Sequence, residues 1–367
     1  MNHSKEKQPI QDRAIQTEKV FEYSLPTAVL GLDCSRDGRF IYAACLDGTV
    51  LEVSSETGKM REIGRHNSYA SGVLTTDQGV VISSGYDGEL HWYDSSEGVL
   101  IRKVKAHRFW SWKTAMTTDQ KWIASVTGQY RCGGYRYEPA PETEPSVKVF
   151  DVATGSLQVE LSMTPPVLSV AFSPDNRYVA AGNLMGDVRV WDIHSGDLKN
   201  EWNTPDFTCW GITKSHHYVG GIFDLAFTPD GERLTLCGMG PMRDPMAGNG
   251  KQTWQQFAWR EQPAGKVAEI GDSDSGKGPM ESLAFHSNRA FFLMAGRMAQ
   301  GNWNVAFFDS ESGTLLHSLD TKMRVTKGLF SEQCGQVLLA GAKGQKKTDK
   351  GDWPEFGRIL AYSILQV

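Results

Sequence analysis

The sequence lacks any long hydrophobic run. None of its apolar stretches approaches the roughly 18 residues needed to span a bilayer. Residues 1–19 are polar and have no apolar centre, which is unlike a signal peptide or an anchor. We therefore expect a soluble protein with no membrane partner.

Cysteine is scarce and unpatterned. The six cysteines include no C-x-x-C pair, and most lie in or beside expected strands. Small buried thiols of this kind are typical of proteins from a reducing compartment. The expected location is the cytoplasm, without disulfides.

Signatures of chemistry are also missing. The chain has no G-x-S-x-G, no P-loop and no H-E-x-x-H motif, and His216-His217 with Cys209 lacks a second ligand pair at a standard metal spacing. No cofactor, no metal site and no catalytic residue are expected. The net charge of -5 argues against nucleic acid as a partner bound through overall charge.

What the chain has is a repeated pattern, clearest over residues 165–196. Leu168 to Phe172 and Tyr178 to Ala181 are short apolar runs, and the Ser-Pro-Asp-Asn sequence between them is a turn. Val188 to Trp191 supplies a third run. The pattern predicts an antiparallel hairpin followed by another strand.

This stretch resembles a repeat of the WD40 family, with Ser-Pro-Asp as its hairpin turn and Trp191-Asp192 as its signature dipeptide. The match recurs along the chain. An aromatic or apolar residue is followed five positions later by Gly at Val53/Gly58, Tyr93/Gly98, Phe150/Gly155, Trp191/Gly196 and Phe308/Gly313, and six positions later at Trp259/Gly265. Polar hairpin turns recur at Asp37, Asp77, Asp119, Asp175, Asp230, Asn288 and Gln333. The sequence therefore predicts seven repeats.

The resemblance implies an all-β, seven-bladed β-propeller of four-stranded antiparallel blades. The seventh repeat ends one strand short, and residues 18–25 alternate apolar and polar side chains before the first full repeat. An open edge would be an aggregation hazard, so residues 18–25 are expected to complete blade seven. Residues 1–17 are then a polar tail, and residues 18–367 form a single WD40-like propeller.

Insertions into the repeats point to one face of the ring. Between the hairpin turn and the signature aromatic, the chain is longer in repeats three, five, six and seven than in the others, and residues 203–220 lengthen one connection between blades. These are loops between a blade's second and third strands (b-c) or between blades (d-a), and antiparallel order places both kinds on the same face. Because the extra loop length is confined to one face, it favours a functional surface there over random drift in loop length.

The enlarged loops are rich in aromatic and arginine side chains, which are enriched at binding hot spots. The candidate binding residues are Trp110, Arg131, Tyr135, Arg136, Trp210, His216, Arg243, Trp254, Trp303 and Trp353. Some of these side chains could instead fold down onto the propeller as local apolar clusters.

Two functions remain open. The first is a noncatalytic WD40-like scaffold that binds a protein or peptide partner of unknown identity through this face. The alternative is an enzyme or small-ligand receptor with a pocket over the central channel, walled by the same loops. A deep pocket with convergent polar groups would favour the alternative, and a broad aromatic surface would favour the scaffold.

Two histidines have a structural interpretation. His66 and His107 precede the first strands of blades two and three at the spacing where the WD40 family places a structural histidine. The resemblance implies a hydrogen bond from His66 to Asp87 in the b-c turn.

Overall fold

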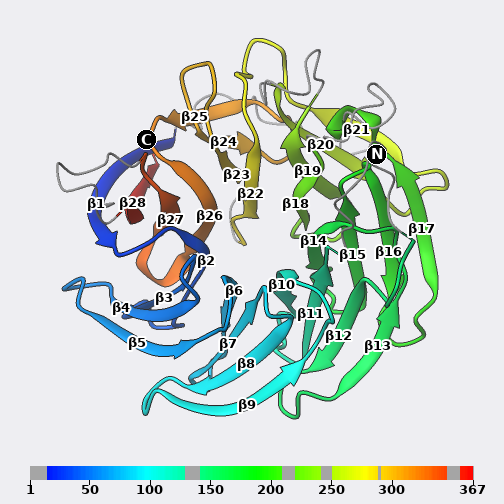
Figure 1. Cartoon of the computed structure of the whole chain (residues 1–367). Helices are drawn as coiled ribbons and strands as arrows, with labels where there is room; N and C mark the ends of the chain where they lie inside the picture. The colour runs from blue at the N-terminus through cyan, green and yellow to red at the C-terminus, as the bar shows by residue number, and fades with distance from the viewer. Residues whose placement is uncertain are drawn as a thin grey trace, which may run out of the picture.

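The computed structural model describes residues 15–128, 141–208, 220–240, 250–287, 291–344 and 356–366. These residues form seven four-stranded antiparallel sheets. The sheets stand like blades in a ring around a central opening (Figure 1). The seven-bladed propeller expected from the repeats is therefore confirmed.

The blades follow one another along the chain, each running from the centre outward. Blades one to three contain β2 (Val29–Cys34), β3 (Phe40–Cys45), β4 (Thr49–Ser54), β5 (Met60–Arg65); β6 (Ala70–Thr75), β7 (Val80–Gly85), β8 (Glu89–Asp94), β9 (Val99–Lys105); and β10 (Ser111–Met116), β11 (Trp122–Thr127), β12 (Val147–Asp151), β13 (Leu157–Leu161). Blades four to six contain β14 (Val167–Phe172), β15 (Tyr178–Asn183), β16 (Asp187–Asp192), β17 (Leu198–Asn203); β18 (Ile222–Phe227), β19 (Leu234–Met239), β20 (Gln252–Ala258), β21 (Gly265–Glu269); and β22 (Met280–Phe285), β23 (Phe291–Gly296), β24 (Val305–Asp309), β25 (Leu315–Leu319).

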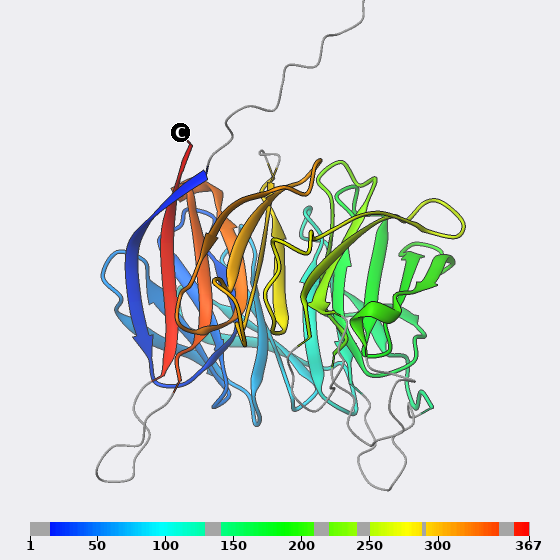
Figure 2. The same ribbon diagram turned by 90° about the horizontal axis from the view of Figure 1, so that it is seen from above.

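Blade seven joins the two ends of the chain. Its strands are β26 (Arg324–Ser331), β27 (Gln336–Ala342), β28 (Gly357–Gln366) and, outermost, β1 (Ile15–Leu25). β1 pairs with β28 from Ile15 opposite Gln366 to Leu25 opposite Gly357, and the two strands run side by side in both ribbon views (Figures 1 and 2). Closure by an N-terminal strand is confirmed, although the strand begins at Ile15 rather than at Glu18. Two short 3₁₀ helices, η1 (Pro205–Phe207) and η3 (Glu332–Cys334), lie in connections.

The core is divided among the seams between blades. A separate cluster of buried apolar side chains fills each of the seven seams, such as Ile41, Ala43 and Val53 against Leu338 and Ile359 between blades one and seven. Each blade is thus held by its two neighbours, so the ring is stable only when every seam is filled.

The signature aromatics lie at a fixed point of the third strand. A β-bulge separates each from the residue before it, at Trp92/Tyr93, Val149/Phe150, Val190/Trp191, Gln256/Phe257 and Phe307/Phe308. The glycines that follow five positions later in four of these blades have φ between 67° and 73°, a left-handed conformation that glycine adopts without steric cost. In blade five this position belongs to Phe257, so the assignment of Trp259 was wrong.

The ring has two unlike faces. Because the strands alternate in direction, the b-c and d-a connections emerge on one face, here called the long-loop face. The a-b and c-d hairpin turns emerge on the other, the hairpin face. The segments outside the described residues at 129–140, 209–219, 241–249 and 345–355 all connect strand ends on the long-loop face.

Candidate functional site

Each innermost strand carries a β-bulge at its second or third residue, at the end that opens on the long-loop face. The residues left without a ladder partner are Leu30, Ser71, Trp112, Leu168, Phe223, Glu281 and Thr326. A bulge redirects the side chain of its extra residue. Here all but Leu168 line one cavity of about 320 Å³ at the mouth of the central channel. We call this the channel-mouth cavity.

A lysine reaches across the bottom of this cavity. Lys113 on β10 of blade three extends to blade five, where its Nζ lies 2.8 Å from Asp224 Oδ1. The same Nζ donates hydrogen bonds to the backbone carbonyls of Phe223 at 2.8 Å and Glu281 at 3.4 Å. Lys113 therefore ties blades three, five and six together through its ion pair with Asp224 and its two backbone hydrogen bonds.

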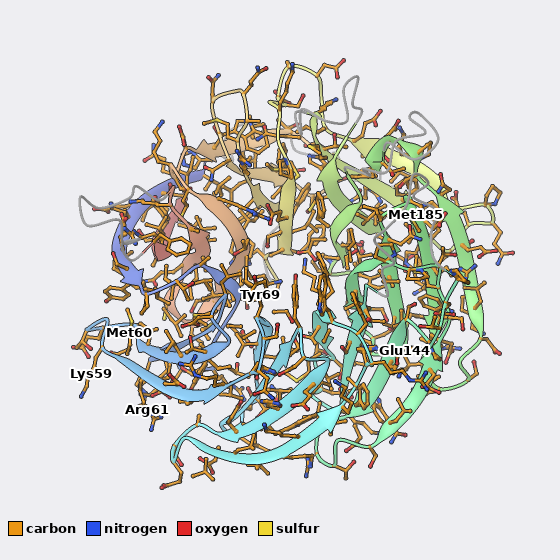
Figure 3. The ribbon with its side chains drawn as sticks, viewed as in Figure 1. Lys59, Met60, Arg61, Tyr69, Glu144 and Met185 are labelled. Atoms are coloured by element: carbon orange, nitrogen blue, oxygen red, sulfur yellow. The ribbon has the colours of Figure 1, made fainter. Side chains whose placement is uncertain are left out.

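One wall of the mouth is a cluster of stacked aromatic rings from blades two and three, here called the aromatic cluster. It consists of Tyr69, Tyr86, Phe109, Trp110 and Trp112. The Tyr86 ring stacks on Trp110, with centroids 4.8 Å apart, and on Trp112, at 5.5 Å. Phe109 extends the stack at 4.6 Å from Trp110. Figure 3 places Tyr69 beside the central opening.

The cluster combines a buried centre with an accessible edge. Burial raises the pKa of Tyr86 to about 12, so its hydroxyl stays neutral near pH 7. Tyr69 and Trp110 are 46% and 37% exposed, although both rings contact other aromatic rings. This edge offers accessible aromatic contact area beside the channel mouth.

The facing wall is charged. Arg324 on β26 binds Glu281 with a paired contact, Nε to Oε1 at 2.7 Å and Nη2 to Oε2 at 2.9 Å. The hydrogen bond to Glu281 is the main cause of the raised pKa of Arg324. Arg297, in the b-c connection of blade six, lines the same cavity and has an exposed side chain.

A larger cavity of about 680 Å³ lies on the hairpin face between blades one and two. Its three arginines are all paired with carboxylates: Arg36 with Asp77, Arg39 with Asp37, and Arg61 with Glu52. The groove is thus balanced in charge and has no exposed aromatic ring cluster. We consider the channel mouth the better candidate site despite its smaller volume.

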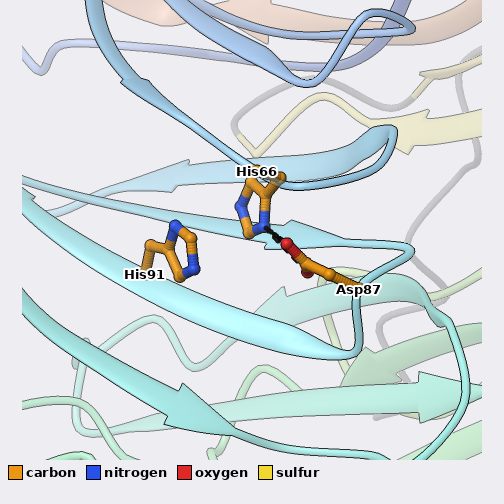
Figure 4. A group of neighbouring side chains, drawn as sticks. All are labelled: His66, Asp87 and His91. Carbon is orange, nitrogen blue, oxygen red and sulfur yellow. Dashed lines mark hydrogen bonds and ion pairs between the residues drawn. The ribbon is translucent and has the colours of Figure 1, made fainter.

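The predicted histidine network is present in blade two (Figure 4). His66 Nδ1 lies 3.0 Å from Asp87 and its Nε2 lies 2.8 Å from Ser83 Oγ, which confirms the expected hydrogen bond. His91 stacks on His66 at 3.9 Å and binds Glu89 and Tyr93 at 2.8 Å each. All four ring nitrogens are therefore partnered.

This network is structural. Asp87, His66 and Ser83 are linked by hydrogen bonds in the order found in a catalytic triad. However, Ser83 is 1% and His66 3% exposed, so no substrate reaches the hydroxyl. His66, Asp87 and His91 are also close enough to suggest a metal site. Stacked imidazoles have their nitrogen lone pairs in parallel planes, so the two rings cannot direct them to one ion.

The network should stabilise the fold in a pH-dependent way. Burial raises the pKa of Asp87, but the hydrogen bond and charge of His66 and the N–H groups of Asn67 and Glu89 outweigh it and lower that pKa to about 2. The resulting stability is complete above the unfolded pKa near 4 and is lost as the pH falls toward 2. We expect Asp87→Asn to cost about 2 kcal/mol at pH 7 and much less at pH 2.5.

Urea unfolding at the two pH values measures this difference. Asp119→Asn removes a carboxylate from an exposed turn and serves as the control. A penalty for Asp87→Asn that is the same at both pH values would contradict the assigned cause.

Blade three repeats only part of this network. His107 Nε2 lies 3.0 Å from Ser125 Oγ, as His66 does from Ser83, but its buried Nδ1 has no hydrogen-bond partner among the described residues. The nearby carboxylate is that of Glu144, which the sequence pattern did not reveal; it accepts from the N–H of Arg108 at 2.7 Å and pairs with Lys148 at 3.0 Å. Glu144 follows the insertion, so its spacing to His107 does not match that of the other repeats.

The structure separates the ten predicted binding residues into three groups. Trp110 lies in the aromatic cluster on the expected face. Trp254 and Trp303 are 1% and 5% exposed: Trp254 lies within β20 rather than in a loop, and the indole of Trp303 donates to the carbonyl of Asp274 at 3.0 Å. The others lie outside the described residues: Arg131, Tyr135, Arg136, Trp210, His216, Arg243 and Trp353.

The loop position expected for Trp254 was therefore wrong, and Trp303 belongs to a loop that folds down onto the propeller. Both indoles pack against Phe308 in the seam between blades five and six. Sequence reasoning also missed Tyr69, Tyr86, Phe109 and Trp112. The signal available was the run Phe109-Trp110-Ser111-Trp112 at the start of an innermost strand.

Comparison with known proteins agrees with the architecture. The family model for the WD domain, G-beta repeat, matches residues 18–51 and 156–192. The chain is 23% identical over 199 residues to WD repeat-containing protein SL1-17 of Schistosoma mansoni, covering 46% of this chain and 66% of that protein. It is 22% identical over 126 residues to Target of rapamycin complex subunit LST8 of Saccharomyces cerevisiae, covering 34% of this chain and 36% of the other.

A third relative is Telomerase protein component 1 of Mus musculus, at 22% identity over 184 residues, or 50% of this chain and 6% of that protein. The matches thus cover less than two thirds of the length of each relative. Among the described residues, no helix is long and apolar enough to cross a membrane. The seven four-stranded blades show a seven-bladed β-propeller, and the repeated turns and the matched repeats support the WD40-repeat family for it.

Proposed function

We propose that this propeller is a noncatalytic scaffold that binds a protein or peptide through its long-loop face, with the aromatic cluster as the anchor. The observation that carries the proposal is the cluster of five aromatic rings beside the channel mouth, in which Tyr69 and Trp110 are exposed. Tryptophan and tyrosine are the residues most enriched where interface free energy is concentrated.

Similarity to WD-repeat proteins supports an interaction scaffold in general. One relative is by its name a complex subunit, and another is a component of telomerase. These names describe those proteins and do not identify the partner of this chain. The seven candidate residues outside the described part of the chain, and the cytoplasmic location, stay predictions.

The test is affinity capture from lysate followed by a measured Kd for the partner identified. Trp110→Ala should leave folding intact, because the side chain is 37% exposed and belongs to none of the seam clusters, and should weaken binding at least about thirtyfold, which corresponds to about 2 kcal/mol. Isothermal titration calorimetry gives the affinity, and circular dichroism confirms the fold.

Arg39→Ala and Asp197→Ala are the matched controls, because both residues lie in exposed turns of the hairpin face. They should bind as the wild type does. Binding that survives Trp110→Ala and is lost in the hairpin-face variants would place the interface on the other side of the ring.

A small-ligand receptor is the second candidate, and the convergence of Lys113, Glu281 and Arg324 in the channel-mouth cavity favours it. The cavity volume of about 320 Å³ is at the lower end of ligand pockets, and all three charges are already paired. A thermal-shift screen of metabolites decides between the two. A ligand that stabilises the wild type and Trp110→Ala but not Arg324→Ala would favour the receptor.

A further inference from the structure

The channel-mouth cavity continues outward into a second one. A cavity of about 470 Å³ lies on the long-loop face between blades six and seven, lined in part by Asp320, Lys322 and Lys343. Arg297 and Arg324 line both cavities, so the two adjoin along these side chains. Together they form a trough that runs from the aromatic cluster to the seam between blades six and seven. We call it the rim trough.

The charge of the rim trough is opposite to that of the chain. Its described lining has five basic residues, Lys113, Arg297, Lys322, Arg324 and Lys343, and two acidic ones, Glu281 and Asp320. The whole chain has a net charge of -5, and the cavity on the hairpin face has equal numbers of basic and acidic residues. The excess of positive charge is therefore a local property of this trough.

Four of the five basic side chains are already paired. Lys113 binds Asp224, Arg324 binds Glu281, and Lys322 binds Asp320; Lys343 forms an ion pair with Glu22. Arg297 differs, because it forms no ion pair with any acidic side chain in the part of the chain that the structure describes. Its backbone N–H donates to the carbonyl of Pro279 at 2.9 Å, which fixes the base of the side chain at the junction of the two cavities.

We propose that the partner segment is an acidic peptide that carries an aromatic or aliphatic anchor. The anchor packs on the exposed edge formed by Tyr69 and Trp110, and a carboxylate farther along the segment binds Arg297. This inference rests on the proposed function and adds the chemistry of the partner. A guanidinium matches a carboxylate with two parallel hydrogen bonds, whereas a basic segment would meet Arg297 with like charge.

Synthetic peptides of equal length test the proposal by fluorescence anisotropy against the full chain. One peptide carries a Trp with neighbouring Glu residues, one a Trp with Lys, one a Trp with Ser, and one Glu residues without an aromatic. We expect the Trp–Glu peptide to bind at least about tenfold more tightly than the Trp–Lys peptide. Arg297→Ala should weaken binding of the Trp–Glu peptide about tenfold, and Arg297→Lys should retain part of the affinity that alanine loses.

Arg36→Ala is the control, because Arg36 is an exposed arginine in the hairpin-face cavity, and it should change nothing. Equal binding of the Trp–Glu and Trp–Lys peptides, or unchanged binding by Arg297→Ala, overturns the acidic partner. If Trp110→Ala weakens binding of the Trp peptides but the wild type binds these peptides equally whatever their charge, the scaffold function stands and this inference fails. If no peptide binds, both fail.

Discussion

Removal of residues 1–25 should destabilise the propeller by at least about 5 kcal/mol and make it associate. β1 is the outer strand of blade seven, and its two ends enter different seams: Ile15 belongs to the cluster between blades six and seven, and Leu25 to that between blades seven and one. Loss of a buried Leu or Ile side chain alone costs about 2–5 kcal/mol. Without β1, the N–H and C=O groups of β28 are also left unpaired, which invites pairing with a second chain.

Guanidinium unfolding and light scattering after gel filtration measure the two effects. Removal of residues 1–14 is the control, because the first buried residue of β1 is Ile15, and this shorter deletion should be nearly silent. If the longer deletion yields no soluble protein, the full-length double variant Ile15→Ala and Leu25→Ala tests the same packing. If the longer deletion or the double variant unfolds at the same guanidinium concentration as the wild type, β1 does not stabilise the ring by closing it.

The architecture could be predicted because it rests on local signals. A hairpin turn such as Ser173 to Asn176 is fixed by the residues within it, and its repetition sets the number of blades. Closure could be predicted for a different reason. The last repeat lacks its fourth strand and the first repeat is preceded by an extra strand, so pairing of the two completes blade seven. Only the start of the extra strand differed, because the polar side chains at its beginning conceal the buried Ile15.

β20 shows where the pattern failed. Its sequence Gln252–Ala258 contains three glutamines, which suggest a loop, yet the strand is buried almost throughout. The glutamines are tolerated because each finds a partner: Gln252 donates to the carbonyl of Trp303 at 3.0 Å, and Gln256 donates to Thr235 at 3.1 Å. A single sequence does not show such partners, so Trp254 was placed in a loop.

The candidate site could not be predicted from the sequence, for a related reason. The aromatic cluster and the rim trough combine blades two and three with blades six and seven, and no spacing within one repeat brings these together. The six bulges that redirect side chains into the channel mouth depend on backbone register, which composition does not reveal. The sequence did predict that Trp110 lies on the long-loop face, because alternation of strand direction is a property of topology alone.

Trp254→Ala should cost about 3–5 kcal/mol of unfolding free energy, whereas Trp110→Ala should cost less than about 1 kcal/mol. Trp254 is 1% exposed and makes edge contacts with Phe292 at 5.3 Å and Phe308 at 5.7 Å. The turn glycine Gly313 covers it so closely that a Cβ there would lie 2.7 Å from the indole. Truncation of Trp254 opens a cavity that this packed seam cannot close, whereas Trp110 is 37% exposed, so its truncation leaves a gap that solvent can enter.

Trp254→Phe sharpens the comparison. The indole N–H of Trp254 is buried and has no hydrogen-bond partner among the described residues, so phenylalanine removes an unsatisfied donor at the same time as it leaves a smaller cavity. The loss should therefore be below about 2 kcal/mol, well short of the loss for alanine. Urea unfolding of the three variants measures these differences. If Trp254→Phe costs as much as Trp254→Ala, the N–H has a partner that the core packing does not explain; if Trp254→Ala and Trp110→Ala cost the same, the division between core and binding tryptophans is wrong.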